Sequence, residues 1–205
     1  ISTSDGDVEY FDGPRGSERL TRVECSNGDV QLFDHHQNLT HIHRNDGSLK
    51  YFEGPWGSER LVKMALPNGS VQYYEGPKGS ERITRMECID GSVQIYSGPR
   101  GIEALVCVQS ANGTRKRFYG ASGTERLVSA ELIDGTKKYF QGLRGAERLT
   151  KIETPDGVVQ HFEGDRHDER LVHVEWLDDV ENDVRTGATT VPPKQGNSTM
   201  TPSAA

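Results

Sequence analysis

One phrase of 22 residues recurs eight times and fills most of this chain of 205 residues. Its clearest copy lies at residues 68–87, and a turn glycine marks each copy. These glycines are Gly6, Gly28, Gly47, Gly69, Gly91, Gly113, Gly135 and Gly157, with one short interval of 19 residues between Gly28 and Gly47. A fixed period of this size is typical of a repeat architecture, in which one supersecondary unit stacks on the next. Such proteins usually act through a surface built by repetition, so the pattern favours binding or scaffolding.

Each copy has the sequence of a β-hairpin. Asn-Gly or Asp-Gly flanked by alternating residues predicts a two-residue type I′ turn, in which both central residues need positive φ. In the clearest copy a strand covers residues 71–75, a loop with glycine and proline covers residues 76–82, and a second strand covers residues 83–88. We therefore predict an all-β fold, an elongated single-layer antiparallel β-meander built from about eight hairpin repeats.

The alternation of side chains along the strands assigns two faces. One face is predicted to collect Val71, Tyr73 and Met86, and the other Arg85 and Glu87. Over the first five repeats the apolar face forms a stripe too large to stay in water, so either the sheet closes on itself or a partner covers it. The predicted partner-binding residues are Val8, Tyr10, Val30, Leu32, Leu49, Tyr51, Val71, Tyr73, Val93 and Ile95.

Two further columns break the alternation near the long loops. An aliphatic residue follows each loop, as at Ile83, and an aromatic residue stands five positions after each turn glycine. We predict that each long loop folds over and buries its own aromatic residue against its own aliphatic residue, as a small second core. The aromatic column, predicted to be a structural ladder, consists of Phe11, Phe33, Phe52, Tyr74, Tyr96, Phe118, Phe140 and Phe162.

The second repeat is shorter by three residues and carries four of the seven histidines, His35, His36, His41 and His43. Imidazoles two positions apart on one strand can converge on a transition metal. No cysteine or carboxylate completes the set at a characteristic spacing, so a degenerate, solvated repeat is the preferred interpretation. We predict no metal site and no cofactor.

The fifth and sixth repeats depart from the pattern in a different way. Ala104 stands where other repeats have arginine, and Arg115–Arg117 is a basic run that Lys137 and Lys138 continue. This run interrupts the apolar stripe. It could dock an acidic partner or a lipid headgroup, or it could protect the sheet against aggregation.

No catalytic residue is predicted. The phrase Gly-x-Glu-Arg recurs along the chain, as at residues 79–82, whereas an active site is needed only once. The glycine loops lack a following helix and a Gly-Lys-Ser/Thr sequence, so they do not indicate phosphate binding. A net charge of −7 argues against nucleic acid as a partner.

The predicted compartment is the cytoplasm. Cys25, Cys88 and Cys107 fall on strands too far apart for a disulfide, which indicates reduced thiols. Asn-x-Ser/Thr sequences, as at Asn68 and Asn112, argue for an extracellular setting, but turn chemistry accounts for these two. The chain begins at Ile1, so we expect a fragment or a processed form, whose targeting the sequence does not decide.

Two segments are expected along the chain. The repeats form a predicted domain at residues 1–178. Residues 179–205 lose the period and become rich in Thr, Pro, Ser, Gly and Ala, which predicts a disordered tail or linker.

Three phrases at Tyr51–Gly54, Tyr73–Gly76 and Tyr139–Gly142, together with the regular glycine turns, resemble MORN repeats. The likeness covers residues 5–178. It implies an elongated single-layer sheet with a role in scaffolding, protein–protein contact, dimerisation or, in some members, lipid association. The step from Gly through Arg-Leu to Asp-Gly and an aromatic residue also resembles the YD repeats of Rhs-type shell proteins.

We therefore predict a non-enzymatic scaffold or protein–protein interaction module, whose partner is another protein or a second copy of the chain. Two alternatives stay open. One is a shell or targeting arm of a larger enzyme or toxin, and the other is a membrane-surface module that binds lipid headgroups. The membrane alternative is not favoured, and no apolar run approaches the length of a membrane span.

Overall fold

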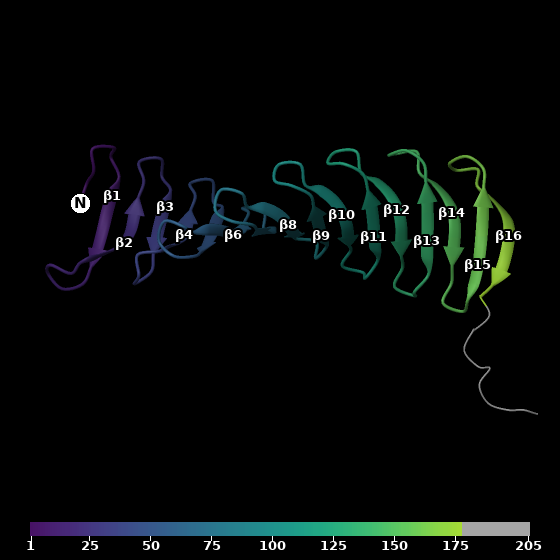
Figure 1. The fold of residues 1–205 in the computed structure, drawn as a ribbon, viewed down its shortest axis with the longest axis horizontal. Coiled ribbons are helices and arrows are strands. Elements are labelled where there is room, and N and C mark those ends of the chain that lie inside the picture. Colours follow the sequence, from purple (N-terminus) through teal and green to yellow (C-terminus); the bar gives the residue numbers. More distant parts are fainter. Residues whose placement is uncertain (178–205) are drawn as a thin grey trace, which may run out of the picture.

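The structure, a computed structural model, describes residues 1–177, and every regular element in that range is a β-strand. Sixteen antiparallel strands form one open sheet, in which each strand pairs only with its neighbours in the sequence (Figure 1). The predicted all-β, single-layer meander of hairpins is confirmed. The predicted tail at residues 179–205 lies outside the described residues.

Long loops and short turns alternate along this sheet. A long loop joins each odd-numbered strand to the next even-numbered strand, and a short turn joins that strand to the following one. The strands are β1 (Val8–Asp12), β2 (Arg19–Glu24), β3 (Val30–Phe33), β4 (Leu39–His43), β5 (Leu49–Glu53), β6 (Arg60–Ala65), β7 (Val71–Glu75), β8 (Arg82–Glu87), β9 (Val93–Ser97), β10 (Ala104–Gln109), β11 (Arg115–Tyr119), β12 (Arg126–Glu131), β13 (Lys137–Gln141), β14 (Arg148–Glu153), β15 (Val158–Glu163) and β16 (Arg170–Trp176).

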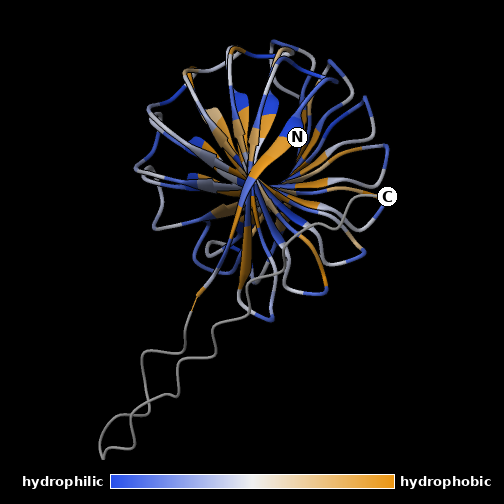
Figure 2. Cartoon of the chain, turned by 90° about the vertical axis from the view of Figure 1, so that its right-hand side faces the viewer, coloured by the Kyte–Doolittle hydropathy of each residue, from blue (hydrophilic) through white to orange (hydrophobic). Residues whose placement is uncertain are grey.

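The sheet is an elongated ribbon that twists strongly about its long axis. Viewed along this axis, the loops and turns point outward around a common centre, and many hydrophobic residues lie along the strands (Figure 2). Paired strands are rotated relative to each other in a fixed sense, and this rotation accumulates over the whole sheet because no second layer opposes it.

The short turns differ from the predicted type I′ geometry. After β2, the N–H of Gly28 donates to the Cys25 carbonyl at 2.9 Å, and the N–H of Cys25 donates to the Asp29 carbonyl at 2.8 Å. Within this turn only the glycine has positive φ, at 87°, and the equivalent Gly91 has a φ of 79°. The connection is therefore a three-residue loop made of a type I turn and a glycine bulge.

The longer turn reverses the predicted assignment of faces. Tyr73 pairs with Lys63 across β6 and β7, whereas a two-residue turn would pair it with Met64. Across β7 and β8, Tyr73 pairs with Arg85. The prediction that Tyr73 and Met86 share one face, with Arg85 on the other, is therefore wrong. The physical reason is that a shift of one residue moves every side chain of a strand to the opposite face.

Two faces result, which we name by their residues. The tyrosine face carries Val71, Tyr73, Arg85 and Glu87 of β7 and β8, and the equivalent residues of the other hairpins. The ladder face carries Gln72, Tyr74, Ile83 and Met86, and their equivalents.

A β-bulge in each hairpin brings the aromatic and aliphatic columns together. In β7 and β8 the register shifts between Tyr73 and Tyr74, which leaves Thr84 as the extra residue and pairs Tyr74 with Ile83. The Thr84 hydroxyl donates to the Tyr73 carbonyl at 3.5 Å, and the equivalent bonds of β2 and β14 are 3.2 Å long. Each aromatic residue thus lies beside its own aliphatic partner on the ladder face.

The sheet has little buried interior. Among the described residues, Val23, Ala130 and Val159 are the only buried hydrophobic residues. Phe11 is 43% exposed, and the other members of the aromatic column are of intermediate burial. The predicted second core beneath the long loops is therefore not closed. The ladder is a side-by-side packing that stays partly open to solvent.

Hydrogen bonds between long loops join consecutive hairpins in place of a core. The Glu81 carboxylate accepts from the Leu61 N–H of the preceding hairpin at 3.1 Å. Equivalent bonds of 3.1–3.3 Å reach the residues at the same position of four later hairpins. In the same direction, Lys78 donates to the Gly57 carbonyl at 2.9 Å. The glutamate of the repeated Gly-x-Glu-Arg phrase thus links one hairpin to the one before it.

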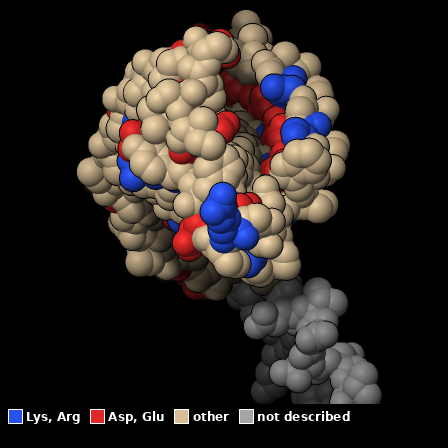
Figure 3. Space-filling model, turned by 90° about the vertical axis from the view of Figure 1, so that its left-hand side faces the viewer, with Lys and Arg blue, Asp and Glu red and all other residues tan. Residues whose placement is uncertain are grey.

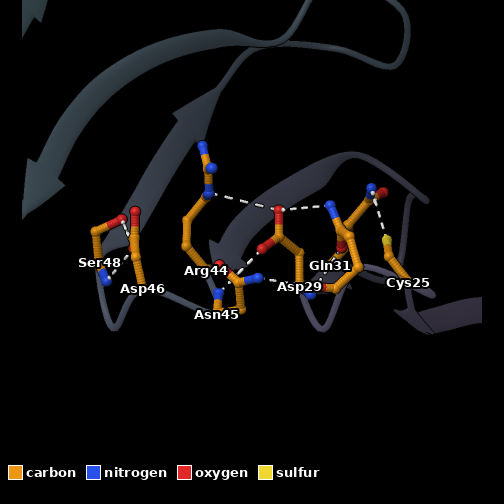
Figure 4. Close-up of polar contacts among 8 residues, drawn as sticks. Cys25, Asp29, Gln31, Arg44, Asn45, Asp46 and Ser48 are labelled. Carbon is orange, nitrogen blue, oxygen red and sulfur yellow. Dashed lines mark hydrogen bonds and ion pairs between the residues drawn. The ribbon is translucent and has the colours of Figure 1, made fainter.

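Similar contacts join the short turns at the other edge of the sheet. Asp29 accepts from the backbone N–H of Asn45 at 3.0 Å, and the Asn45 side chain donates to a carbonyl of the preceding turn at 2.7 Å (Figure 4). Arg44 Nε lies 3.5 Å from an Asp29 carboxylate oxygen. Consecutive hairpins are therefore linked at both edges.

We expect this elongation to be measurable in solution. Fifteen strand spacings of about 4.8 Å give a length of about 70 Å, and a rod of that length alone has a radius of gyration of about 21 Å. A compact globule of the same number of residues would have a radius of gyration of about 17 Å. Small-angle X-ray scattering distinguishes the two, and a value near the compact one would show that the ribbon folds back on itself.

Candidate partner-binding surface

The tyrosine face is built from repeated groups of three polar side chains. The Tyr73 hydroxyl donates to Glu87 at 3.1 Å, and Arg85 forms an ion pair with the same carboxylate at 2.5 Å. The Arg85 guanidinium also lies 5.3 Å from the centre of the Tyr73 ring, within reach of a cation–π interaction. Burial raises the pKa of the Tyr73 hydroxyl, and its hydrogen bond to Glu87 raises it further. Tyr73 is therefore a neutral donor at physiological pH.

The same group recurs elsewhere on this face. The Tyr10 and Tyr139 hydroxyls donate to Glu24 and Glu153 at 3.0 and 2.7 Å. In the second group, Lys151 lies 2.6 Å from the Glu153 carboxylate. The hydrogen bond from Lys151 is the main cause that lowers the pKa of Glu153. Each group satisfies its own charges, so these parts of the face leave no free cation for a partner.

All ten predicted partner-binding residues lie on the tyrosine face, but they do not form a continuous apolar stripe. They occupy the odd-numbered strands β1, β3, β5, β7 and β9, and the strands between them place polar residues on the same face. Tyr51, for example, lies between His41 and Lys63. Viewed from the β1 end, acidic side chains gather along a hollow of the ribbon, with basic ones at its rim (Figure 3). The face is thus mixed in character.

A hollow with a different charge pattern lies on the tyrosine face between β11 and β13. We call it the basic hollow, and its volume is about 310 Å³. Three cationic side chains line it, together with one carboxylate and the hydroxyl-bearing Ser129. The charged residues are Arg115, Arg117, Lys137 and Glu131. Arg117 pairs with Ser129, and Arg115 pairs with Glu131, which in turn pairs with Lys137.

The cations of the basic hollow come from changes at two repeated positions. Arg115 and Arg117 occupy the positions that Val71 and Tyr73 occupy in β7, and Ser129 occupies that of Arg85. Within residues 1–177, Arg115, Arg117 and Lys137 form no ion pair, in contrast to Arg85 and Lys151. The hollow can therefore offer its positive charge to an anionic group.

A second hollow, of about 680 Å³, opens between two long loops, the one after β9 and the one after β11. We call it the apolar hollow, because no charged side chain lines it. Its apolar lining includes Pro99, Ile102, Ala104, Val106, Phe118 and Tyr119. Ile102 is 62% exposed and Tyr119 is 69% exposed, so both offer apolar surface to solvent.

The sequence contained only part of the signal for these two hollows. The basic run at Arg115–Arg117 and the loss of arginine at Ala104 were both visible in the repeat alignment. The apolar hollow was missed, because it depends on changes at several separate positions. Ser97 and Tyr119 replace the acidic residue that ends β7, and Ile102 replaces the serine of the Gly-Ser-Glu-Arg phrase.

The four histidines of the second repeat lie apart in two places. His35 and His36 are in the long loop after β3, with ring centroids 3.7 Å apart. His41 and His43 are on the tyrosine face of β4, where they pair with Tyr51 and Leu49. Over residues 1–177, no three His, Cys, Asp or Glu side chains come together in a way that could hold a metal ion.

The three cysteines form no disulfide in the described part of the chain. Burial raises the pKa of the Cys25 thiol, and Gln31 donates to its sulfur at 3.4 Å. No helix in the described range is long and apolar enough to cross a membrane.

No protein-family model and no curated protein matches the chain. Among solved structures, the TCP10 domain of Danio rerio CPAP, in complex with a peptide of Danio rerio STIL, matches with a TM-score of 0.38 and 17% identity over 86% of this chain and 98% of that one. A structure of TcdB2-TccC3-TEV matches with a TM-score of 0.19 and 12% identity over 77% of this chain and 10% of that one. TM-scores of this size carry no functional argument.

Proposed function

We propose that this chain is a non-enzymatic interaction module that binds a protein partner on its tyrosine face, with the basic hollow as the centre of contact. The observation that carries the proposal is the group of Arg115, Arg117 and Lys137, three cations around one hollow that form no ion pair with the described residues. Elsewhere on this face, Arg85 and Lys151 each form an ion pair with a neighbouring glutamate. Lys63, another cation of this face, lies instead over the Tyr51 ring, 4.9 Å from its centre.

The architecture supports this proposal. A single-layer sheet leaves both faces of every strand accessible, and its rigid backbone fixes the spacing of side chains over many strands. Positive charge in a hollow recognises carboxylates through charge-assisted hydrogen bonds, and Arg can bind a carboxylate with two parallel donors. The proposed partner is therefore a protein segment rich in Asp or Glu. We expect this chain and its partner to meet in the cytoplasm, the compartment predicted from the sequence.

The direct test is binding of a fluorescein-labelled hexaglutamate peptide to the whole chain, followed by fluorescence polarisation. We expect saturable binding that weakens as salt is added, because exposed charges are screened. The double variant Arg115→Glu, Arg117→Glu should weaken binding by about tenfold or more. Hexalysine, which acidic side chains elsewhere on the chain attract, should bind the double variant no more weakly than the unchanged chain.

Lys116→Glu is the matched control for this experiment. Lys116 lies between the two arginines in the sequence, but it pairs with Ala130 on the ladder face. The control changes the net charge by two units, as the single variant Arg117→Glu does, but without touching the basic hollow. It should bind hexaglutamate nearly as well as the unchanged chain, whereas Arg117→Glu should bind it several-fold more weakly. Equal losses for Lys116→Glu and Arg117→Glu would show that net charge alone governs binding, against the proposal. Binding to phosphatidylserine vesicles with no binding to hexaglutamate would favour the membrane alternative instead.

A further inference from the structure

We propose that the apolar hollow takes one bulky, uncharged aromatic side chain of the same partner segment, with tryptophan as the best match. This inference rests on the proposed function, because it names a second feature of the partner that the basic hollow recruits. The partner would then be an extended acidic segment with an aromatic anchor.

The apolar hollow lies where the repeat loses an ion pair. Arg82 lies 3.9 Å from Glu75, and Arg60 lies 3.6 Å from Glu53, each pair at the entrance of a long loop. The corresponding pair of β9 and β10 is Ser97 with Ala104. A hollow without charged groups favours an uncharged occupant, because an isolated ion would lose its hydration there.

The same replacement removes a link between hairpins. The guanidinium of Arg82 donates to the Gly98 carbonyl of the next hairpin at 3.1 Å, and Arg148 donates to the Gly164 carbonyl at 3.0 Å. Ala104 has no donor with which to reach Gly120, which lines the hollow. No side chain of residues 1–177 donates to the Gly120 carbonyl, and unlike Gly76 and Gly142, which also lack a side-chain donor, Gly120 has no arginine at the position of Arg82 that could reach it. An occupant with one N–H donor and a large apolar surface would fit this combination, and the indole of tryptophan has both.

The hollow also has a rim suited to an aromatic ring. Tyr119 and Ile102, which are both exposed, line the hollow together with Phe118 of the ladder. The Arg126 guanidinium lies 5.7 Å from the centre of the Tyr119 ring, which holds that ring from the side of β12. As at every junction between consecutive hairpins, β10 and β11 pair over three residues only, here Cys107 to Gln109, so the two long loops lie apart where the hollow begins. An inserted ring would fill the gap between them.

The two hollows are neighbours on one strand. Arg117 lines the basic hollow, and Tyr119, two residues further along β11, lines the apolar hollow. Two residues of a strand span about 6.6 Å, which is the shortest separation between the two linings along one face of β11, so a partner in extended conformation needs at least two positions between its acidic residues and its aromatic residue. This proximity is the reason for assigning one occupant to both hollows.

The test compares two peptides on the whole chain. Both peptides contain four glutamates and differ at one position two residues away from them, which is Trp in one peptide and Ala in the other. The pair is made twice, once with this position before the glutamates and once with it after them. For one of these orders we expect the Trp peptide to bind the unchanged chain about fivefold more tightly than its Ala counterpart. Equal affinity of Trp and Ala peptides in both orders would overturn the inference while leaving the proposed function intact.

The variant Ala104→Arg provides the sharpest control, because it restores the residue found at this position in other repeats. The new guanidinium should occupy the hollow and donate to the Gly120 carbonyl, as Arg82 does to Gly98. The variant should lose the preference for Trp and keep its affinity for the Ala peptide. Its added positive charge can only favour an acidic peptide, so a lost preference cannot come from charge. A preference for Trp that survives in Ala104→Arg would place the indole elsewhere and overturn the inference.

Two further outcomes separate this inference from the proposed function. If neither glutamate peptide binds, the proposed function fails. The apolar hollow is then tested alone, by titrating N-acetyl-tryptophanamide into the chain with isotope-labelled methyl groups and following the methyl chemical shifts by NMR. Shifts at Ile102 and Val106 that disappear in Ala104→Arg would support the apolar hollow alone, and no shift would overturn it. Sedimentation velocity tests a second copy as the occupant, and a dimer that Ala104→Arg dissociates would also overturn the proposal.

Discussion

Replacing Gly142 by alanine should lower the free energy of unfolding of the C-terminal hairpins by about 3 kcal/mol or more. Gly142 begins the long loop after β13 with a φ of 123°, and a Cβ there would lie 2.6 Å from the Ala146 carbonyl oxygen. The strain has no simple relief, because the contacting atom belongs to the backbone of the same tight loop. Urea denaturation followed by circular dichroism measures the loss.

Gly145→Ala in the same loop is the matched control. Gly145 also has a positive φ, of 77°, but a Cβ at this position would meet nothing within 4 Å. Its cost should be limited to that of a left-handed backbone, about 1 kcal/mol. Hydrogen exchange should show lost protection near β13–β16 for Gly142→Ala, because stacked repeats interact only with their neighbours. Equal destabilisation by the two substitutions would contradict the assigned loop geometry.

The second large effect is a loss of stability in acid. Five glutamates that link the long loops, Glu59, Glu81, Glu125, Glu147 and Glu169, have a lowered pKa. For Glu81, burial acts to raise the pKa, but hydrogen bonds from its own N–H and from the N–H groups of Leu61 and Gly79 together lower it below the ordinary value. The carboxylate form is the one that these donors stabilise.

The lowered pKa of these glutamates determines how the stability of the fold changes with pH. A glutamate whose pKa is lower in the folded state stabilises the fold above its unfolded pKa of about 4.3, and this contribution disappears as the pH falls through the folded value. We therefore expect the urea midpoint to be constant from pH 7 to about pH 5 and to fall steeply below about pH 4.5. Five such sites act on one sheet, so the summed loss should be large.

Glu81→Gln tests whether these links cause the acid effect. The amide resembles the protonated acid, so this variant should be less stable than the unchanged chain at pH 7 and should lose less on acidification. Glu53→Gln serves as the control, because Glu53 forms only an exposed ion pair with Arg60. A Glu81→Gln variant with the full acid sensitivity of the unchanged chain would show that other carboxylates are responsible.

The fold was largely predictable because its signal repeats. Each Asp-Gly or Asn-Gly turn, each alternating strand and each glycine loop occurs several times, so an accidental match at one copy is corrected by the others. The faces were not predictable with the same certainty, because they depend on one residue of turn length. The N–H of Cys88 donates to the Ser92 carbonyl across three loop residues, whereas a type I′ turn would have only two. This additional loop residue places Arg85 on the tyrosine face and Met86 on the ladder face, the reverse of the predicted assignment.

The two hollows also differ in how far they could be predicted from the sequence. The basic run at Arg115–Arg117 is contiguous in the sequence, and its role as a docking site was among the predicted alternatives. The apolar hollow is assembled from Ser97, Ala104 and Tyr119, three changes on three different strands. Each change alone is an ordinary departure from a repeat. Their meeting depends on how consecutive hairpins separate beyond Cys107, which is a property of the sheet and not of any local phrase.

The links between hairpins have a consequence for how such a chain can change in length. Every strand contacts only its neighbours in the sequence, and each glutamate link reaches back by one hairpin. Removing or duplicating a whole hairpin would create a junction of the same kind as those already present. The shortened second repeat shows that even an imperfect unit is accepted. The length of the sheet can therefore change in steps of one hairpin, while the two hollows keep their place between β9 and β13.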